Sequence, residues 1–261
     1  PSGAVVLSLA SVPFENAVSD VSSFAVHGFG TGYDAGSFKH HAYFDNIGVW
    51  KGWGTADEKL IYSNDFTCCS RDITSERASS LLAYQYNLDD GPDGWRRVDG
   101  TGGANRNTSL TVRGTDSSRC VCLASEAAGT AGQKARFTQA LPEELADSEV
   151  ITTTVDMRSP SFFAGASGFA GLELGGRLAA RTEWRSGDGD AAVRFGFAEA
   201  NGTAAAGLYR STLFVEGSGG KTFPVPSTDV TKWYRFVVRM NQATKRCRIR
   251  IYDQGRTRPV A

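Results

Sequence analysis

The sequence predicts an all-β protein built as an antiparallel β-sandwich. Apolar residues recur with a period of two in most of the apolar segments, which is the period of a strand. These segments are short, and each ends at Gly, Asp, Asn or Ser. The chain has 30 Gly and only 2 Met among its 261 residues, which favours many turns and few helices. Many short strands with turn residues at this spacing are typical of two packed antiparallel sheets.

The clearest hairpin lies near the C-terminus. The segment "WYRFVVRM" (233–240) alternates, and so does "KRCRIRIY" (245–252), with "NQAT" (241–244) between them as the connecting loop. In the second strand the apolar positions 247, 249 and 251 face one side of the sheet, and three arginines face the other.

Further short strands are expected along the chain, and one segment is expected to be helical. "LPEELADSEV" (141–150) predicts a short helical turn, because Pro142 stands near its start. The other predicted strands are "SLTVRG" (109–114), "RCVCLAS" (119–125), "EVITTTVDMR" (149–158), "GLELGG" (171–176), "AVRFGFAEA" (192–200) and "TLFVEG" (212–217).

Charge and hydropathy exclude some classes of partner. Lys and Arg together number 28, and so do Asp and Glu, so no global charge favours nucleic acid or an acidic membrane surface. No apolar run reaches the roughly 18 residues that a membrane-spanning helix needs. The N-terminal residues lack a signal-peptide pattern, so for an exported protein we expect the targeting segment outside this sequence.

Several segments resemble one family of β-sandwiches. "IYSNDFT" (61–67) followed by "DGPDGWRRVDG" (90–100) is similar to the opening of a laminin-G-like, or concanavalin A-like, jelly roll. The hairpin 233–255 resembles the penultimate hairpin of that fold. Residues 12–30 and "AYFDNIGVW" (42–50) resemble its closing strands. The resemblance implies a concanavalin-like or laminin-G-like jelly roll over nearly the whole chain.

The resemblance also implies an unusual order of strands. In family order the main body runs from 57 to 261, and the closing strands are residues 1–56. Three explanations stay open: a circular permutant, the tail of one module before most of the next, or one period of a tandem array, which we favour. Because "AYFDNIGVW" carries large apolar groups on both faces, we expect it in a covered position beside the strand that begins at "IYSNDF".

The cysteines and two sequons indicate an extracellular or cell-surface protein. The C-C and C-x-C spacings do not match zinc sites, so one or two disulfides are expected, with five reduced buried thiols as the alternative. Asn107 and Asn201 each begin an N-x-[ST] sequon and are candidates for N-glycosylation. The disulfide candidates are Cys68, Cys69, Cys120, Cys122 and Cys247.

The sequence offers little support for catalysis. The three histidines, at 27, 40 and 41, have no metal-ligand spacing and are expected in loops or at the surface. "ARTEWRSGDGD" (180–190) resembles one strand of the jelly-roll alginate lyases, but the histidine and tyrosine strands of those enzymes have no counterpart here. A polysaccharide lyase is therefore the third choice, and we expect a non-catalytic protein.

Glycan binding has better candidates. Aromatic rings stack on sugar faces, and Arg side chains bind carboxylate or sulfate. Trp50, Trp53, Trp95 and Trp184 are more often packing residues than ligand platforms. A solvated sheet face is the alternative to a binding patch. The candidate patch consists of Trp233, Arg235, Arg239, Arg246, Arg248 and Arg250.

Two aspartates are candidate ligands of a structural calcium ion. Asp45 and Asp65 stand where the first and last strands of such a sandwich meet, and Ca²⁺ takes oxygen ligands. The alternative is that both residues end their strands through turn hydrogen bonds.

Together these features predict a non-catalytic extracellular structural module, a tandem-repeat unit of a surface or fibre protein. Its expected partners are neighbouring copies of itself, with no nucleic acid. The alternative is a carbohydrate-binding module of a polysaccharide-degrading enzyme, with polysaccharide as the partner.

Overall fold

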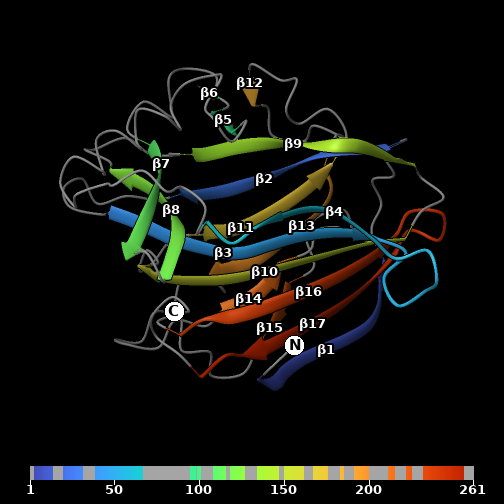
Figure 1. The fold of residues 1–261 in the computed structure, drawn as a ribbon. Helices are drawn as coiled ribbons and strands as arrows, with labels where there is room; N and C mark the ends of the chain where they lie inside the picture. The colour runs from blue at the N-terminus through green and yellow to red at the C-terminus, as the bar shows by residue number, and fades with distance from the viewer. Residues whose placement is uncertain are drawn as a thin grey trace.

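The fold is described by a computed structural model. It describes residues 3–13, 20–31, 39–66, 95–97, 99–100, 108–115, 118–126, 134–146, 150–161, 167–175, 183–184, 191–199, 211–214, 222–224 and 232–255. These residues form strands and turns without a helix, so the predicted all-β antiparallel sandwich is confirmed (Figure 1). No helix within these ranges could cross a membrane.

Most of the described residues form two antiparallel sheets, and the first of them, sheet A, has eight strands. β4 (Lys59–Asn64) pairs with β3 (Lys39–Lys51) beside the main path of this sheet. In spatial order that path runs through β1 (Ala4–Pro13), β17 (Arg246–Asp253), β16 (Tyr234–Asn241), β10 (Val150–Ser161), β3 (Lys39–Lys51), β8 (Ser118–Glu126) and β7 (Thr108–Thr115).

The second sheet, sheet B, has seven strands and covers one face of sheet A. A separate parallel pair joins β12 (Glu183–Trp184) to β6 (Asp99–Gly100). In spatial order sheet B consists of β15 (Thr222–Pro224), β14 (Ser211–Phe214), β13 (Ala191–Glu199), β11 (Ser167–Gly175), β2 (Asp20–Thr31), β9 (Lys134–Ala146) and β5 (Trp95–Arg97).

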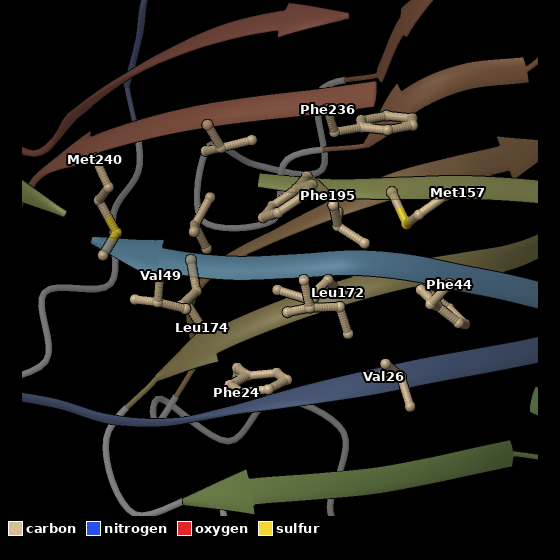
Figure 2. Packing of buried hydrophobic residues seen from close by; sticks show 14 of the residues in the cluster. Phe24, Val26, Phe44, Val49, Met157, Leu172, Leu174, Phe195, Phe236 and Met240 are labelled. Carbon is tan, nitrogen blue, oxygen red and sulfur yellow. The ribbon is translucent and has the colours of Figure 1, made fainter. Parts of the chain in front are cut away.

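The core lies between the two sheets (Figure 2). Alternate residues of each strand point inward, so the predicted period of two becomes a buried inner face and an outer face. Rings from both sheets meet there: the Phe236 ring lies 5.3 Å from that of Phe197 and 6.3 Å from that of Phe195, between centroids. Phe24 of β2 makes an edge contact with Tyr62 of β4 at 4.9 Å.

Residues 1–56 contribute strands to both sheets. β1 pairs with the C-terminal β17, β2 lies between β11 and β9, and β3 lies between β10 and the pair β8 and β4. The blue strands of Figure 1 are therefore spread through the molecule. The predicted neighbourhood is confirmed, because Ile47 to Lys51 of β3 pair with Asn64 to Lys59 of β4. The division of the chain at residue 56 stays a prediction.

One predicted element is wrong. The helical turn expected over 141–150 is instead the end of β9, which continues to Ala146, and the start of β10 at Val150. Leu141 and Leu145 are buried in the core, and Val21 of β2 pairs with Leu145 across a register shift. Burial beside a partner strand outweighs the weak local helical preference of a short segment.

Candidate functional site

A groove lies on the outer face of sheet A. Its floor crosses β4, β3, β10 and β16, and its volume of about 540 Å³ falls in the range of small-molecule sites. It is lined by Asn46, Ile47, Gly48, Trp50, Trp53, Ser63, Asn64, Asp65, Thr154, Arg235 and Val237.

Two tryptophans form a corner in this groove. Gly48 and Trp50 are two residues apart on β3, so they share the outer face. The six-membered part of the Trp50 ring lies over Gly48, where a Cβ would overlap it. The Trp53 ring stands against the Trp50 ring at 4.5 Å between centroids and 79° between planes. The half-buried Trp50 ring therefore forms part of the floor of the groove, and the half-buried Trp53 ring forms a wall.

The turn after β3 holds Trp53 in this place. Gly52 and Gly54 have φ of 60° and 77°, a backbone conformation that Gly adopts without strain. The carbonyl of Gly52 accepts a hydrogen bond from the backbone N–H of Thr55 at 2.9 Å, and the N–H of Gly54 donates to Glu58 Oε2 at 2.8 Å. Trp53 is thus carried by a turn with its own hydrogen bonds.

A bulge in β3 supplies the polar side of the groove. The register between β3 and β10 shifts here, and Asn46 has a φ of 50°. Its backbone N–H donates to Asp45 Oδ1 at 2.8 Å, and its Nδ2 donates to Asp156 Oδ2 at 2.9 Å. The bulge turns the Asn46 side chain toward β10, where it contacts the buried Asp156.

Arg235 closes this side of the groove. Its Nε donates to Asp156 Oδ1 at 2.6 Å and its Nη2 to Asp156 Oδ2 at 2.7 Å, a bidentate pair. These hydrogen bonds raise the pKa of Arg235 above its usual value, while partial burial opposes them. The Asp156 side chain is fully buried and that of Arg235 is 25% exposed, so the guanidinium remains at the groove wall.

Asp65 and Asn64 border the other side. Asn64 Oδ1 accepts a hydrogen bond from the backbone N–H of Phe66 at 2.7 Å, which places the Phe66 ring in the core and leaves Asp65 exposed at the groove. Asp45, in contrast, is buried at the bulge. Within the described ranges no three His, Cys, Asp or Glu side chains are grouped to hold a metal ion. The predicted calcium site at Asp45 and Asp65 stays a prediction.

The six residues of the predicted glycan-binding patch lie in different environments in the structure. Trp233 is fully buried, so its ring is not available for stacking on a ligand, and this part of the prediction is wrong. The Arg158 guanidinium lies 6.0 Å from the centroid of the buried Trp233 ring. Arg235 belongs to the groove. The remaining four members, Arg239, Arg246, Arg248 and Arg250, are exposed on the outer face of β16 and β17.

The expected disulfides are not found among the described cysteines. Cys120, Cys122 and Cys247 are buried thiols that form no disulfide. Cys122 cannot bridge to Cys247, because β16, β10 and β3 lie between β8 and β17 in sheet A, and Cys247 faces the core while Cys122 contacts the outward Tyr43. Burial, with the neighbouring Cys122 thiol, raises the pKa of Tyr43 to about 12. Cys68 and Cys69 lie outside the described residues.

Of the other candidate residues, some lie within the described residues and some do not. The sequons at Asn107 and Asn201 lie outside the described residues. Glu183, from the lyase-like segment, lies in the two-residue strand β12, apart from the two large sheets. The histidines, expected in loops or at the surface, lie on the strands β2 and β3.

Several residues of the site carry no clear signal in the sequence. Asn46, Gly48 and Thr154 of the lining were not candidates, nor was Asp156, which binds Arg235, and Trp50 and Trp53 were assigned to packing. One signal was present: a Gly two residues before a Trp on a strand leaves space for the ring to lie across the backbone. The pairing of Asp156 with Arg235, 79 residues apart, follows only from strand order.

Comparisons with known proteins give no relative for this chain. No protein-family model, no curated protein and no solved structure matches it.

Proposed function

We propose that this protein is a non-catalytic carbohydrate-binding β-sandwich that binds one segment of a polysaccharide in the groove of sheet A. The observation that carries the proposal is the corner of Trp50 and Trp53 beside polar side chains in that groove. The site would operate outside the cell, where polysaccharides are found.

The chemistry of the groove supports this ligand class. A sugar ring has an apolar C–H face and a rim of hydroxyls. The Trp50 and Trp53 rings offer the surface on which such a face stacks. Asn46, Asn64, Asp65 and Arg235 supply both donors and acceptors for hydroxyls.

The groove is also organised before any ligand binds. Trp50 is seated on Gly48, Trp53 stands on a hydrogen-bonded turn, and Arg235 is held by Asp156. Side chains that are already ordered lose less conformational entropy on binding. The proposal needs no movement of the sheet.

Binding to a panel of soluble polysaccharides by affinity electrophoresis and calorimetry tests this proposal. Trp53→Ala should abolish binding of the polysaccharide that the wild type retains, while the melting temperature stays nearly unchanged. Leu60→Ala is the matched control, because Leu60 is a 48% exposed apolar residue of the same sheet that does not line the groove. Equal retention of wild type and Trp53→Ala would refute the proposal.

A structural role is the second candidate, and the edge of sheet A favours it. β1 ends the strand order, and within the described part of the chain no strand pairs with its other edge. Its Val5 is 55% exposed. An open edge with an apolar side chain can pair with a strand of a neighbouring copy, as in a tandem array of a fibre or surface protein.

Thermal unfolding of single and tandem chains tests the second candidate. Two linked copies should be more stable than one by thermal unfolding, and Val5→Lys should remove the difference because a charge on an edge strand opposes pairing. Identical melting temperatures for the single and the linked wild-type copies would count against it.

A further inference from the structure

Four exposed arginines form a stripe on the outer face of sheet A next to the groove. We call Arg239 of β16 and Arg246, Arg248 and Arg250 of β17 the arginine stripe. Arg239 is the register partner of Arg248, so two guanidinium side chains start directly opposite each other on neighbouring strands.

This arrangement is unfavourable without a counter-charge. Like charges directly opposite each other on antiparallel strands destabilise the pair. In the part of the chain that the structure describes, Arg239, Arg248 and Arg250 have no carboxylate partner, and Arg246 contacts only Ser11 Oγ, at 3.5 Å. The nearby Asp253 pairs with Lys232 instead, at 3.5 Å. An anion bound here would relieve the repulsion.

The stripe continues directly from the groove. Val237 lines the groove and is the register partner of Arg250. Arg239 follows Val237 two residues later on the same face. Neighbouring strands are about 4.8 Å apart and alternate residues about 7 Å apart, so both arginines begin where the groove ends. One extended ligand can contact both surfaces.

The groove and the stripe differ in charge. In the groove the charge of Arg235 is compensated by its bidentate partner Asp156. The groove therefore suits a hydroxylated, uncharged part of a ligand. Anionic groups are favoured on the stripe, where Arg side chains bind carboxylate or sulfate in bidentate fashion.

We infer that the groove and the arginine stripe form one site for an anionic polysaccharide, with a sugar ring on Trp50 and Trp53 and carboxylate or sulfate groups on Arg239, Arg248 and Arg250. This inference rests on the proposed function and names the ligand class.

Charged and uncharged forms of the same polysaccharide separate the two parts of the site. The probes are polygalacturonate and its methyl ester, a sulfated galactan and its desulfated form, and hyaluronan and its methyl ester, each titrated calorimetrically into the full chain. For at least one pair the charged form should bind at least about tenfold more tightly, since two charge-assisted contacts are added. Raising the salt concentration should reduce that difference.

Two variants assign the difference to its residues. Arg248→Ala with Arg250→Ala should remove most of the difference in affinity between the two forms and leave the affinity for the uncharged form unchanged. Arg248→Lys with Arg250→Lys should retain part of the preference. Both residues are exposed, so the fold should persist, which the melting temperature checks. Trp53→Ala should weaken binding of both forms.

Each other outcome overturns one claim or both. Equal affinity of the wild type for the two forms of every pair, with binding still lost in Trp53→Ala, would refute the anionic class and keep the groove. Binding of the charged form that Trp53→Ala leaves intact would refute the groove and leave a purely ionic surface. Tighter stripe-dependent binding of a thymidine oligonucleotide than of every polysaccharide would refute the saccharide, and no binding of any probe would refute both.

Discussion

Asp156 on β10 and Arg235 on β16 form a bidentate ion pair between neighbouring strands, with Nε to Oδ1 at 2.6 Å and Nη2 to Oδ2 at 2.7 Å. They are also register partners, so the pair connects the two strands from the outer face. Asn46 of β3 adds a hydrogen bond to the same carboxylate at 2.9 Å. Three strands of sheet A thus share one buried carboxyl group.

Removal of the Arg235 guanidinium alone should therefore lower the stability of the fold. Arg235→Met leaves the carboxylate of Asp156 buried without its charged partner, and we expect the free energy of unfolding to fall by about 3 kcal/mol. The double variant Arg235→Met with Asp156→Leu should lose less than the sum of the two single variants. Denaturant unfolding of all four proteins gives the coupling energy. Additive losses would show that the pair does not act as a unit.

Gly48→Ala should displace the Trp50 ring without removing any aromatic group. The new methyl group would overlap the six-membered part of the ring, so the ring must leave its place beside Trp53. We expect the near-ultraviolet circular dichroism of the coupled tryptophans to weaken and ligand binding to fall at least about tenfold. The stability should change little, since Trp50 is only half-buried. If the spectrum changed and ligand binding did not, the Trp50 ring would not be part of the binding site.

The contact between the sheets at Phe236 should dominate the stability of the core. Its ring is buried and lies against those of Phe195 and Phe197 on sheet B. Phe236→Ala should lower the free energy of unfolding by about 3–5 kcal/mol, because a large cavity remains. Val237→Ala, one residue away on the outer face, is the control and should cost much less. Equal losses in a urea titration would contradict the assignment of the two faces.

The stability should decrease in alkaline solution through Cys247. Burial raises the pKa of its thiol from 9.0 to about 12, so the unfolded chain releases this proton at lower pH than the folded one. The stabilisation is complete below pH 9 and is lost as the pH rises toward 12, with a slope of up to about 1.4 kcal/mol per pH unit. Cys247→Ala should show a smaller slope than the wild type. The folded protein should resist iodoacetamide at Cys247, and rapid alkylation at pH 8 would contradict this.

The fold class could be predicted because it depends on local periodicity. The alternation in 233–252 determines which side chains face the core, and the burial pattern of β16 and β17 follows it. The prediction fails at Trp233, which lies just before β16 and is buried. Its ring lies 6.0 Å from the guanidinium of Arg158, a residue 75 positions away in sequence. Contacts of this kind depend on the order of strands in the sheet, which periodicity does not contain.

The candidate site was only partly predictable for the same reason. The exposed arginines could be found from alternation within one hairpin. The groove joins β4, β3, β10 and β16, which are separated by up to about 190 residues, so its lining is a property of tertiary structure. At 141–150 the local pattern was misleading. The segment has a weak helical preference, but pairing with β2 makes its first part a strand.

The strands of residues 1–56 occupy three different places in the sandwich. β2 and β3 are inner strands of the two sheets, and β1 pairs with β17 so that Ala4 is the register partner of Asp253. Without them β10, β11 and β17 would each lose a neighbour, and the buried Phe24, Phe44 and Val49 would be missing from the core. Burial of these side chains contributes several kcal/mol, an appreciable share of a domain's stability of about 5–15 kcal/mol. A protein of residues 57–261 should therefore aggregate or remain molten, with no cooperative transition by circular dichroism. Fusing residues 1–56 after Ala261 through a short linker should restore it, since Ala4 and Asp253 already lie side by side. A sharp two-state transition of 57–261 alone would show that residues 1–56 are not needed to complete this sandwich.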